Sequence, residues 1–136
     1  MAERTADSGG KRGLRLLVLE DDVGVGYALG RWLRERHVQP ILAATTADAM
    51  AMLQDAAFIQ VSFDGLLADY NLPDASGLRV IRYFCTEYPA LPVALMTGAW
   101  DLTLELWTRA RHIPLFRKPL QLEDVETWLH EVEATH

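Results

Sequence analysis

Short apolar segments alternate with amphipathic segments along most of the chain. Nearly continuous apolar runs predict strands that are covered on both faces, and apolar residues three and four positions apart predict helices. The predicted strands are 14–20, 39–43, 65–68, 93–96 and 115–117; the predicted helices are 23–36, one that Thr46 caps, 78–87, 101–111 and 121–134. Five strands, each followed by a helix, predict one α/β domain with a parallel sheet and right-handed crossovers.

Two of these helices carry further predictions. The first contains Gly26 and Gly30, and each glycine costs about 1 kcal/mol relative to alanine inside a helix. We expect these small residues to leave a flat, accessible surface that suits a partner helix. In the third helix, Cys85 repeats with Leu78 and Ile81 at helical spacing. Cys85 is therefore predicted to be a buried core residue rather than a reactive thiol.

Composition and charge limit the possible partners and location. The 136 residues carry a formal net charge of -6, which argues against nucleic acid or an anionic membrane as the main partner. A single cysteine allows no internal disulfide and fits a reducing cytoplasm. No apolar run is long enough to span a membrane. Residues 1–13 are polar and are predicted to form a flexible leader before the domain at 14–136, in which no internal repeat is recognised.

Polar side chains follow four of the predicted strands. Glu20, Asp21 and Asp22 stand at the end of the first strand, Asp69 at the end of the third, Thr97 of the fourth and Lys118 of the fifth. Acids in such positions are often helix caps, and a lysine before proline is often an ordinary surface residue. The carboxyl ends of parallel strands meet at one edge of a sheet, where open α/β folds bind their ligands. The joint occurrence of these polar side chains at four strand ends therefore predicts a binding site.

The residue types in this set suit phosphoryl transfer. Neighbouring carboxylates repel one another, and a hard divalent cation such as Mg²⁺ relieves that repulsion. Lys118 can pair with a phosphoryl oxygen, and Thr97 adds a hydroxyl donor. An aspartate such as Asp69 can itself be the nucleophile toward phosphorus, which gives an acyl phosphate. Phosphoryl transfer needs mainly positioning and neutralisation of charge, and this set offers both.

In this order and spacing, the residues resemble the receiver domains of two-component response regulators. The matching segments are 17–22, 69–78, 93–98 and 115–119, and the resemblance extends over about residues 14–134. It implies a flavodoxin-like, doubly wound sheet of five parallel strands in the order 2-1-3-4-5 with five helices.

The resemblance also implies roles for individual residues. Asp69 matches the phosphoacceptor, Thr97 the switch hydroxyl and Lys118 the lysine that pairs with the phosphoryl group. The implied Mg²⁺ ligands are Asp21, Asp69, the backbone carbonyl of Asn71 and, through water, Glu20; Gly77 matches a loop glycine, and the Lys118–Pro119 bond is expected to be cis. One position departs from the pattern, because Leu115 stands where many relatives have an aromatic residue that moves with the switch hydroxyl.

The implied function is that of a phosphoacceptor signalling domain in a phosphorelay, not an enzyme. A sensor histidine kinase or a histidine phosphotransfer protein would donate the phosphoryl group, and an unidentified downstream protein would read the switched surface. The motif wording is closer to receivers of hybrid histidine kinases than to those of DNA-binding regulators. Three alternatives stay open. The first is an Asp-based, Mg²⁺-dependent phosphatase or phosphotransferase, which would normally need an acid at the position that Asn71 occupies. The second is a structural receiver that takes no phosphate, and the third is a nucleotide- or flavin-binding module, which would need a glycine-rich phosphate loop after the first strand.

Overall fold

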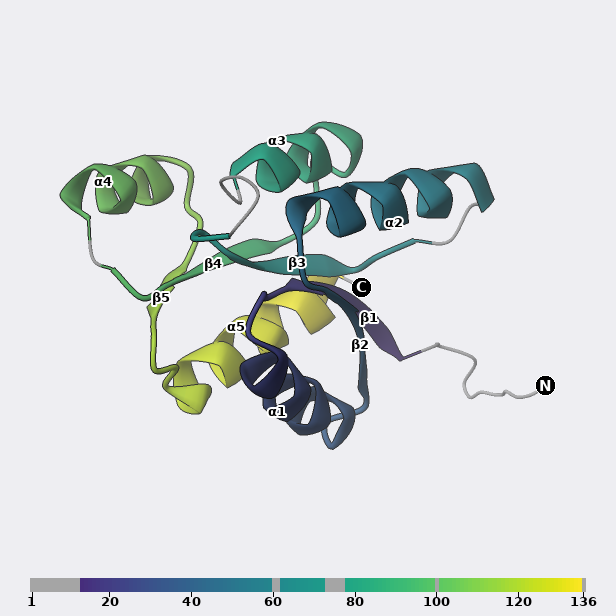
Figure 1. Cartoon of the computed structure of the whole chain (residues 1–136), viewed down its shortest axis with the longest axis horizontal. Coiled ribbons are helices and arrows are strands. Elements are labelled where there is room, and N and C mark those ends of the chain that lie inside the picture. The colour runs from purple at the N-terminus through teal and green to yellow at the C-terminus, as the bar shows by residue number, and fades with distance from the viewer. Residues whose placement is uncertain (1–12, 60–61, 73–77, 100, 136) are drawn as a thin grey trace.

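The computed structural model describes residues 13–59, 62–72, 78–99 and 101–135 (Figure 1). The predicted leader lies outside these residues except for Gly13, and so does Gly77. In the part of the chain that is described, no helix is both long and apolar enough to cross a bilayer.

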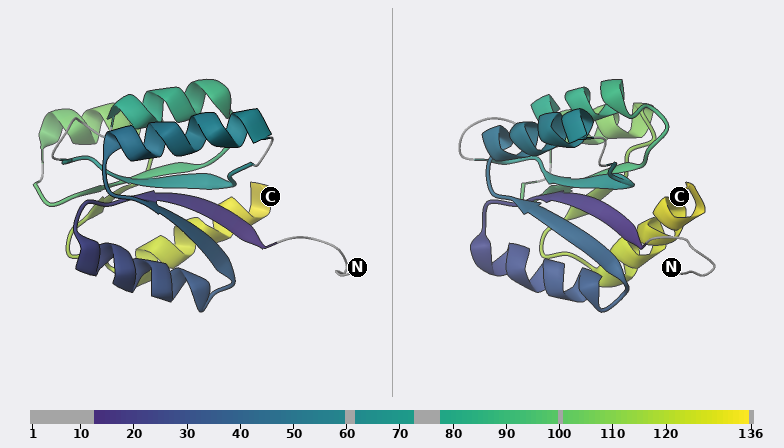
Figure 2. Two further views of the ribbon diagram at one scale, coloured as in Figure 1. Left: turned by 45° about the vertical axis from the view of Figure 1, so that its right-hand side comes forward. Right: turned by 90° about the vertical axis from the view of Figure 1, so that its right-hand side faces the viewer.

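Strands and helices alternate from one end of the described chain to the other. The elements are β1 (Leu14–Leu19), α1 (Val23–Arg34), β2 (Val38–Ala43), α2 (Thr46–Ile59), β3 (Gly65–Asp69), α3 (Leu78–Glu87), β4 (Val93–Thr97), α4 (Leu102–Ala110), β5 (Leu115–Arg117) and α5 (Leu122–Thr135). All neighbouring strands pair in parallel, in the order β2-β1-β3-β4-β5. Helices α1 and α5 cover one face of the sheet, and α2, α3 and α4 cover the other (Figures 1 and 2). The predicted doubly wound fold is confirmed.

The central strands are almost entirely apolar because helices cover both of their faces. Successive side chains of a strand point to opposite faces of the sheet. In β1, Leu17 and Leu19 therefore join the core beneath α2, α3 and α4, whereas Leu16 and Val18 join the core beneath α1 and α5. The two cores fix the sheet between two helical layers and hold the carboxyl ends of the strands in place.

The prediction for α1 is wrong in one respect. Gly26 and Gly30 are buried, and a Cβ atom on Gly30 would lie 3.6 Å from side-chain atoms of both Pro40 and Leu42. These glycines therefore face β1 and β2 and let the helix approach the sheet closely, rather than opening a surface for a partner. The exposed apolar residues of α1 are others, with Val23 82% and Tyr27 66% exposed.

Two smaller predictions are also wrong. Cys85 is exposed, because the buried stripe of α3 is centred on Val80, Ile81 and Phe84 and Cys85 lies at its border. The side chain that caps α2 belongs to Thr45, whose hydroxyl accepts a hydrogen bond from the backbone N–H of Asp48 at 3.0 Å. The predicted cap, Thr46, is instead the first residue of the helix.

Candidate functional site

Polar side chains from four strand ends meet at one edge of the sheet, as the sequence predicts. Glu20 and Asp21 follow β1, Asp69 is the last residue of β3, Thr97 is the last residue of β4, and Lys118 follows β5. Carboxylate oxygens of Glu20, Asp21 and Asp69 lie within 4.8 Å of one another. The parallel topology thus brings together acids that lie about fifty residues apart in the chain.

The Lys118 ammonium joins two of these acids. Its Nζ atom donates to Asp69 Oδ2 at 2.7 Å and lies 2.5 Å from Glu20 Oε1. Glu20 and Asp69 are buried, with 5% and 3% of their surface exposed, whereas Asp21 is exposed. The backbone N–H of Lys118 donates to the carbonyl of Thr97 at 2.8 Å, which places the lysine beside the end of β4. The Lys118–Pro119 bond is cis, as predicted.

Burial and charge shift the pKa values of this pair. Burial raises the pKa of the Glu20 carboxyl, although the hydrogen bonds from Lys118 and from the backbone of Asp22 oppose the shift. For Lys118, burial alone would lower the pKa of the ammonium. Its hydrogen bonds to Asp69 and Glu20 outweigh that effect and raise the pKa above the ordinary value. Lys118 therefore stays charged at neutral pH, and its charge compensates the buried acids.

Thr97 connects this acidic site to the loop after β4. Its hydroxyl is buried and lies 2.8 Å from the carbonyl of Ala99 and 3.3 Å from Asn71 Oδ1, and it accepts the backbone N–H of Ala99 at 3.2 Å. A hydroxyl has a single proton, so it can donate fully to only one of the two acceptors. In this structure the nearer acceptor is Ala99, which ties the Thr97 side chain to the loop that leads into α4.

The Asn71 side chain makes a contact that the sequence did not predict. Its backbone N–H donates to Asp69 Oδ1 at 3.0 Å, and its side-chain oxygen approaches the Thr97 hydroxyl. Asp69, Asn71 and Thr97 therefore form one connected polar group. The only sequence signal was the position of Asn71 two residues after Asp69, and that position predicted only a role for its backbone carbonyl.

Two neighbouring side chains of β5 face opposite sides of the sheet, because side chains alternate along a strand. Leu115 is half-buried against the core beneath α2, α3 and α4, while Phe116 packs on the other face with its ring edge-on to Trp128. No aromatic ring of β5 therefore stands on the Thr97 side of the strand. The hydrogen bonds of Thr97 with Ala99 instead connect its hydroxyl to the loop after β4.

The arrangement has a clear chemical capacity. One buried carboxylate, Asp69, has an ammonium on one oxygen and a backbone N–H on the other. Two more acids stand close enough to share a cation with it, and carboxylate oxygens are ligands that hard cations such as Mg²⁺ prefer. A hydroxyl donor, Thr97, completes the edge. This set can bind a cation and a tetrahedral anion side by side.

Comparisons with known proteins point in the same direction. No family model matches the chain. The sensor protein TorS of Escherichia coli (strain K12) is 28% identical over 112 residues, and the DNA-binding transcriptional regulator NtrC of Proteus hauseri is 32% identical over 87 residues. The matches cover 82% and 62% of this chain but only 12% and 17% of those two proteins.

Solved structures show the same fold. The response regulator receiver domain protein (CheY-like) of Methanospirillum hungatei JF-1 superposes with a TM-score of 0.78 at 19% identity, over 90% of this chain and 95% of that one. The fold is that of a response-regulator receiver domain, and the two sequence matches fit such a domain. One match is named a sensor and the other a DNA-binding regulator, so the predicted similarity to hybrid kinases stays a prediction.

Proposed function

We propose that this chain is a phosphoacceptor signalling domain that receives a phosphoryl group on Asp69. The donor is the phosphohistidine of a histidine kinase or of a histidine phosphotransfer protein. The observation that carries the proposal is the buried Asp69 carboxylate held by Lys118, with Glu20 and Asp21 beside it, at the edge of a receiver-domain sheet. The chain then acts as the substrate of a kinase and as a signal for a downstream protein.

The chemistry follows from the contacts of Asp69. One of its carboxylate oxygens attacks phosphorus, the new O–P bond forms, and the N–P bond of the phosphohistidine breaks. The imidazole nitrogen keeps the electron pair of that bond. Lys118, already 2.7 Å from Asp69 Oδ2, neutralises charge on the transferred phosphoryl oxygens. Positioning and charge neutralisation are the main contributions that such a transfer needs.

The acidic residues fit a magnesium ion. Oxygens of three carboxylates lie within 4.8 Å of one another, so their negative charges repel, and a bound divalent cation relieves that repulsion. Asp21, Asp69 and the backbone carbonyl of Asn71 would hold the ion directly, and Glu20 would act through water. When bound, Mg²⁺ supplies positive charge to the phosphoryl oxygens.

The switch begins at Thr97. With a phosphoryl group on Asp69, the single proton of the Thr97 hydroxyl gains a charged acceptor that is stronger than the Ala99 carbonyl. Its donation to Ala99 is then lost, which loosens the connection between β4 and the loop before α4. The downstream protein reads the resulting shift on the face of α4, β5 and α5, where Leu102 and Leu106 are exposed. We include a cytoplasmic location in this proposal.

Labelling with acetyl phosphate tests the assignment. The protein incubated with acetyl phosphate and Mg²⁺ should gain the mass of one phosphoryl group, and Asp69→Asn should gain none. Omitting Mg²⁺ should slow the labelling strongly. Undiminished labelling of Asp69→Asn would refute the choice of acceptor. Sustained turnover of a small phosphate ester would instead support the phosphatase alternative.

A further inference from the structure

Two helix ends in this fold repeat a short motif. Residues 32–38 follow the pattern Trp-x-Arg-x-Arg-His and then valine, and residues 107–113 follow the same pattern and then isoleucine. The first copy ends α1 and leads into β2, and the second ends α4 and leads into β5. Both histidines have left-handed backbone angles, with φ of 62° at His37 and 56° at His112. The repeat went unrecognised in the sequence because it is far shorter than a structural repeat.

The two copies place an arginine on a tryptophan in the same way. The Arg36 guanidinium lies 4.0 Å from the centre of the Trp32 ring, and its Nη1 donates to the Trp32 carbonyl at 3.2 Å. The Arg111 guanidinium lies 4.2 Å from the centre of the Trp107 ring, and its Nη1 donates to the Trp107 carbonyl at 3.1 Å. Each copy therefore holds a cation in a fixed position, and both stand at the sheet edge opposite Asp69.

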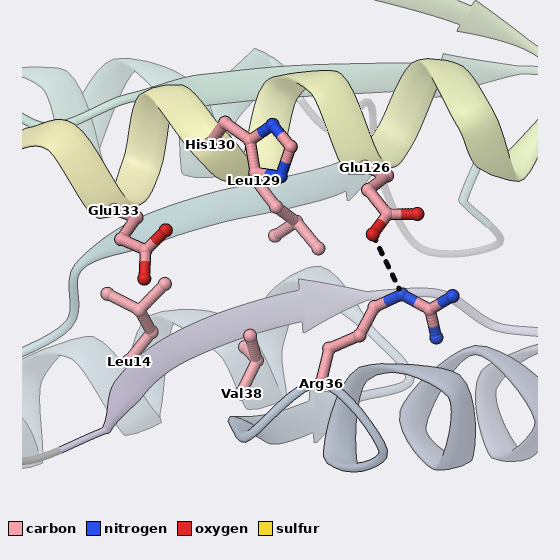
Figure 3. A pocket seen from close by; sticks show the side chains of 7 residues that line it. All are labelled: Leu14, Arg36, Val38, Glu126, Leu129, His130 and Glu133. Atoms are coloured by element: carbon pink, nitrogen blue, oxygen red, sulfur yellow. Dashed lines mark ion pairs between the residues drawn. The ribbon is translucent and has the colours of Figure 1, made fainter.

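In the first copy, this cation is neutralised by the chain itself. Glu126 of α5 lies 3.5 Å from Arg36, measured from Oε2 to Nε, and the two side chains face each other across a pocket (Figure 3). The pocket has a volume of about 200 Å³, and the apolar side chains of Leu14, Val38 and Leu129 line it together with His130 and Glu133. An acidic, amphipathic helix thus docks here through a glutamate and a leucine three residues later.

In the second copy, the equivalent cation has no carboxylate. Among the described residues, Arg111 forms no ion pair, and neither does the neighbouring Arg82 of α3. Both line a pocket of about 360 Å³ between α3 and α4, and its apolar wall includes Ile81, Val93 and Ile113. In the second pocket, α3 forms the wall that α5 forms in the first, but it contributes Arg82, and no carboxylate is among the lining residues. The second pocket therefore has the cation and the apolar wall of the first, but not the acid that neutralises it.

We propose that the pocket between α3 and α4 docks an acidic, amphipathic helix of a partner protein. The partner presents a glutamate to Arg111 and Arg82 and an apolar side chain, one helical turn away, to the wall formed by Ile81, Val93 and Ile113. The occupant is inferred from the first copy, where α5 offers this arrangement to Arg36. Local charge complementarity supports it, because Arg82 and Arg111 stand together at this pocket and neither forms an ion pair among the described residues. The site is separate from Asp69 and does not depend on the phosphoacceptor assignment.

A peptide with the sequence of α5, residues 122–135, is a suitable probe. A staple between positions 127 and 131, both exposed in α5, keeps the short peptide helical and leaves Glu126 and Leu129 free. Fluorescence anisotropy of the labelled peptide should show saturable binding to the intact 136-residue protein. Arg111→Gln should weaken binding about fivefold, the upper end for an exposed ion pair, and Arg82→Gln should also weaken it. Arg36→Gln, the matched change in the first copy, should leave binding unchanged.

Several results would overturn the proposal. One is no saturable binding, and another is equal binding by the Arg111→Gln, Arg82→Gln and unchanged proteins. Backbone amide resonances should shift at Val93 and Ile113; shifts at Leu14 and Val38 instead would mean that the peptide merely displaces α5. A Glu126→Gln peptide that binds as tightly as the original would show that the peptide carboxylate does not pair with the two arginines. Equally effective competition by hexanoate, on a molar basis, would mean a small carboxylate site rather than a docking surface for a helix.

Discussion

Replacing Lys118 with methionine should destabilise the protein in a way that depends on pH. Methionine keeps much of the apolar length of the side chain but removes the ammonium that joins Glu20 and Asp69. Only 22% of the Lys118 side chain is exposed, and the Glu20 and Asp69 side chains are 1% and 5% exposed. Removing one partner of a buried ion pair costs about 3–5 kcal/mol, and the partial exposure of Lys118 favours the lower end.

The sign of the pH dependence comes from Glu20. Burial already raises the pKa of this carboxyl above its ordinary value of 4.5, and loss of Lys118 removes groups that oppose the shift. A carboxyl with a raised pKa contributes stability that is fully present below 4.5 and is lost as the pH rises through its folded pKa. Lys118→Met should therefore cost about 3 kcal/mol at pH 7, roughly 10 °C in the melting temperature, and clearly less at acidic pH.

Urea denaturation at several pH values measures this effect. Lys118→Arg keeps a positive charge and serves as the matched control, with a smaller loss at pH 7. Mg²⁺ should recover more stability in Lys118→Met than in the unchanged protein, because a cation then replaces the missing ammonium among Glu20, Asp21 and Asp69. An equal loss of stability at pH 5 and pH 7 would refute the argument, since it would mean that the lysine acts through packing rather than through charge.

Three further substitutions test separate contacts. Thr97→Val should still accept the phosphoryl label, detected by mass, but should lose the label-dependent shift of α4 amide resonances because the hydroxyl that bonds to Ala99 is gone. Asp22→Ala removes the side chain that accepts the backbone N–H of Val25 at 3.0 Å and should cost about 1 kcal/mol in urea denaturation. Gly30→Ala should stabilise the protein by up to about 1 kcal/mol, because its Cβ meets only ordinary contacts at 3.6 Å or more; a large loss would mean that α1 cannot yield even slightly.

The fold could be predicted because its central strands have an unambiguous pattern. A run such as β1, apolar in five of six positions and too short for a typical helix, favours a strand covered on both sides, and its alternation with helices favours parallel pairing. The convergence of Glu20, Asp69 and Lys118 then follows from topology alone, because parallel strands end at one edge. These predictions needed no knowledge of side-chain packing.

The errors arose where packing decides between two interpretations. A glycine in a helix can leave an open surface or permit a close approach, and only the position of β2 shows that Gly30 does the latter. For Cys85, a spacing of three and four residues gives the direction of the buried stripe of α3 but not its width. The Asn71–Thr97 contact depends on loop geometry between two strands, for which the sequence carries no periodic signal.

Helix α4 connects the two sites at opposite edges of the sheet. It starts just after the loop that Thr97 binds through Ala99, and its C-cap residue, Arg111, lines the pocket between α3 and α4. Its nine residues span about 13 Å as a rigid rod, so a shift of its first turn also moves Trp107 and Arg111 relative to α3. Phosphorylation of Asp69 should therefore change the affinity for an acidic helix at Arg111. By linkage, the bound helix must change the equilibrium of phosphorylation by the same factor. Peptide titration of the labelled and unlabelled protein measures that factor, and identical affinities would show that the two edges act independently.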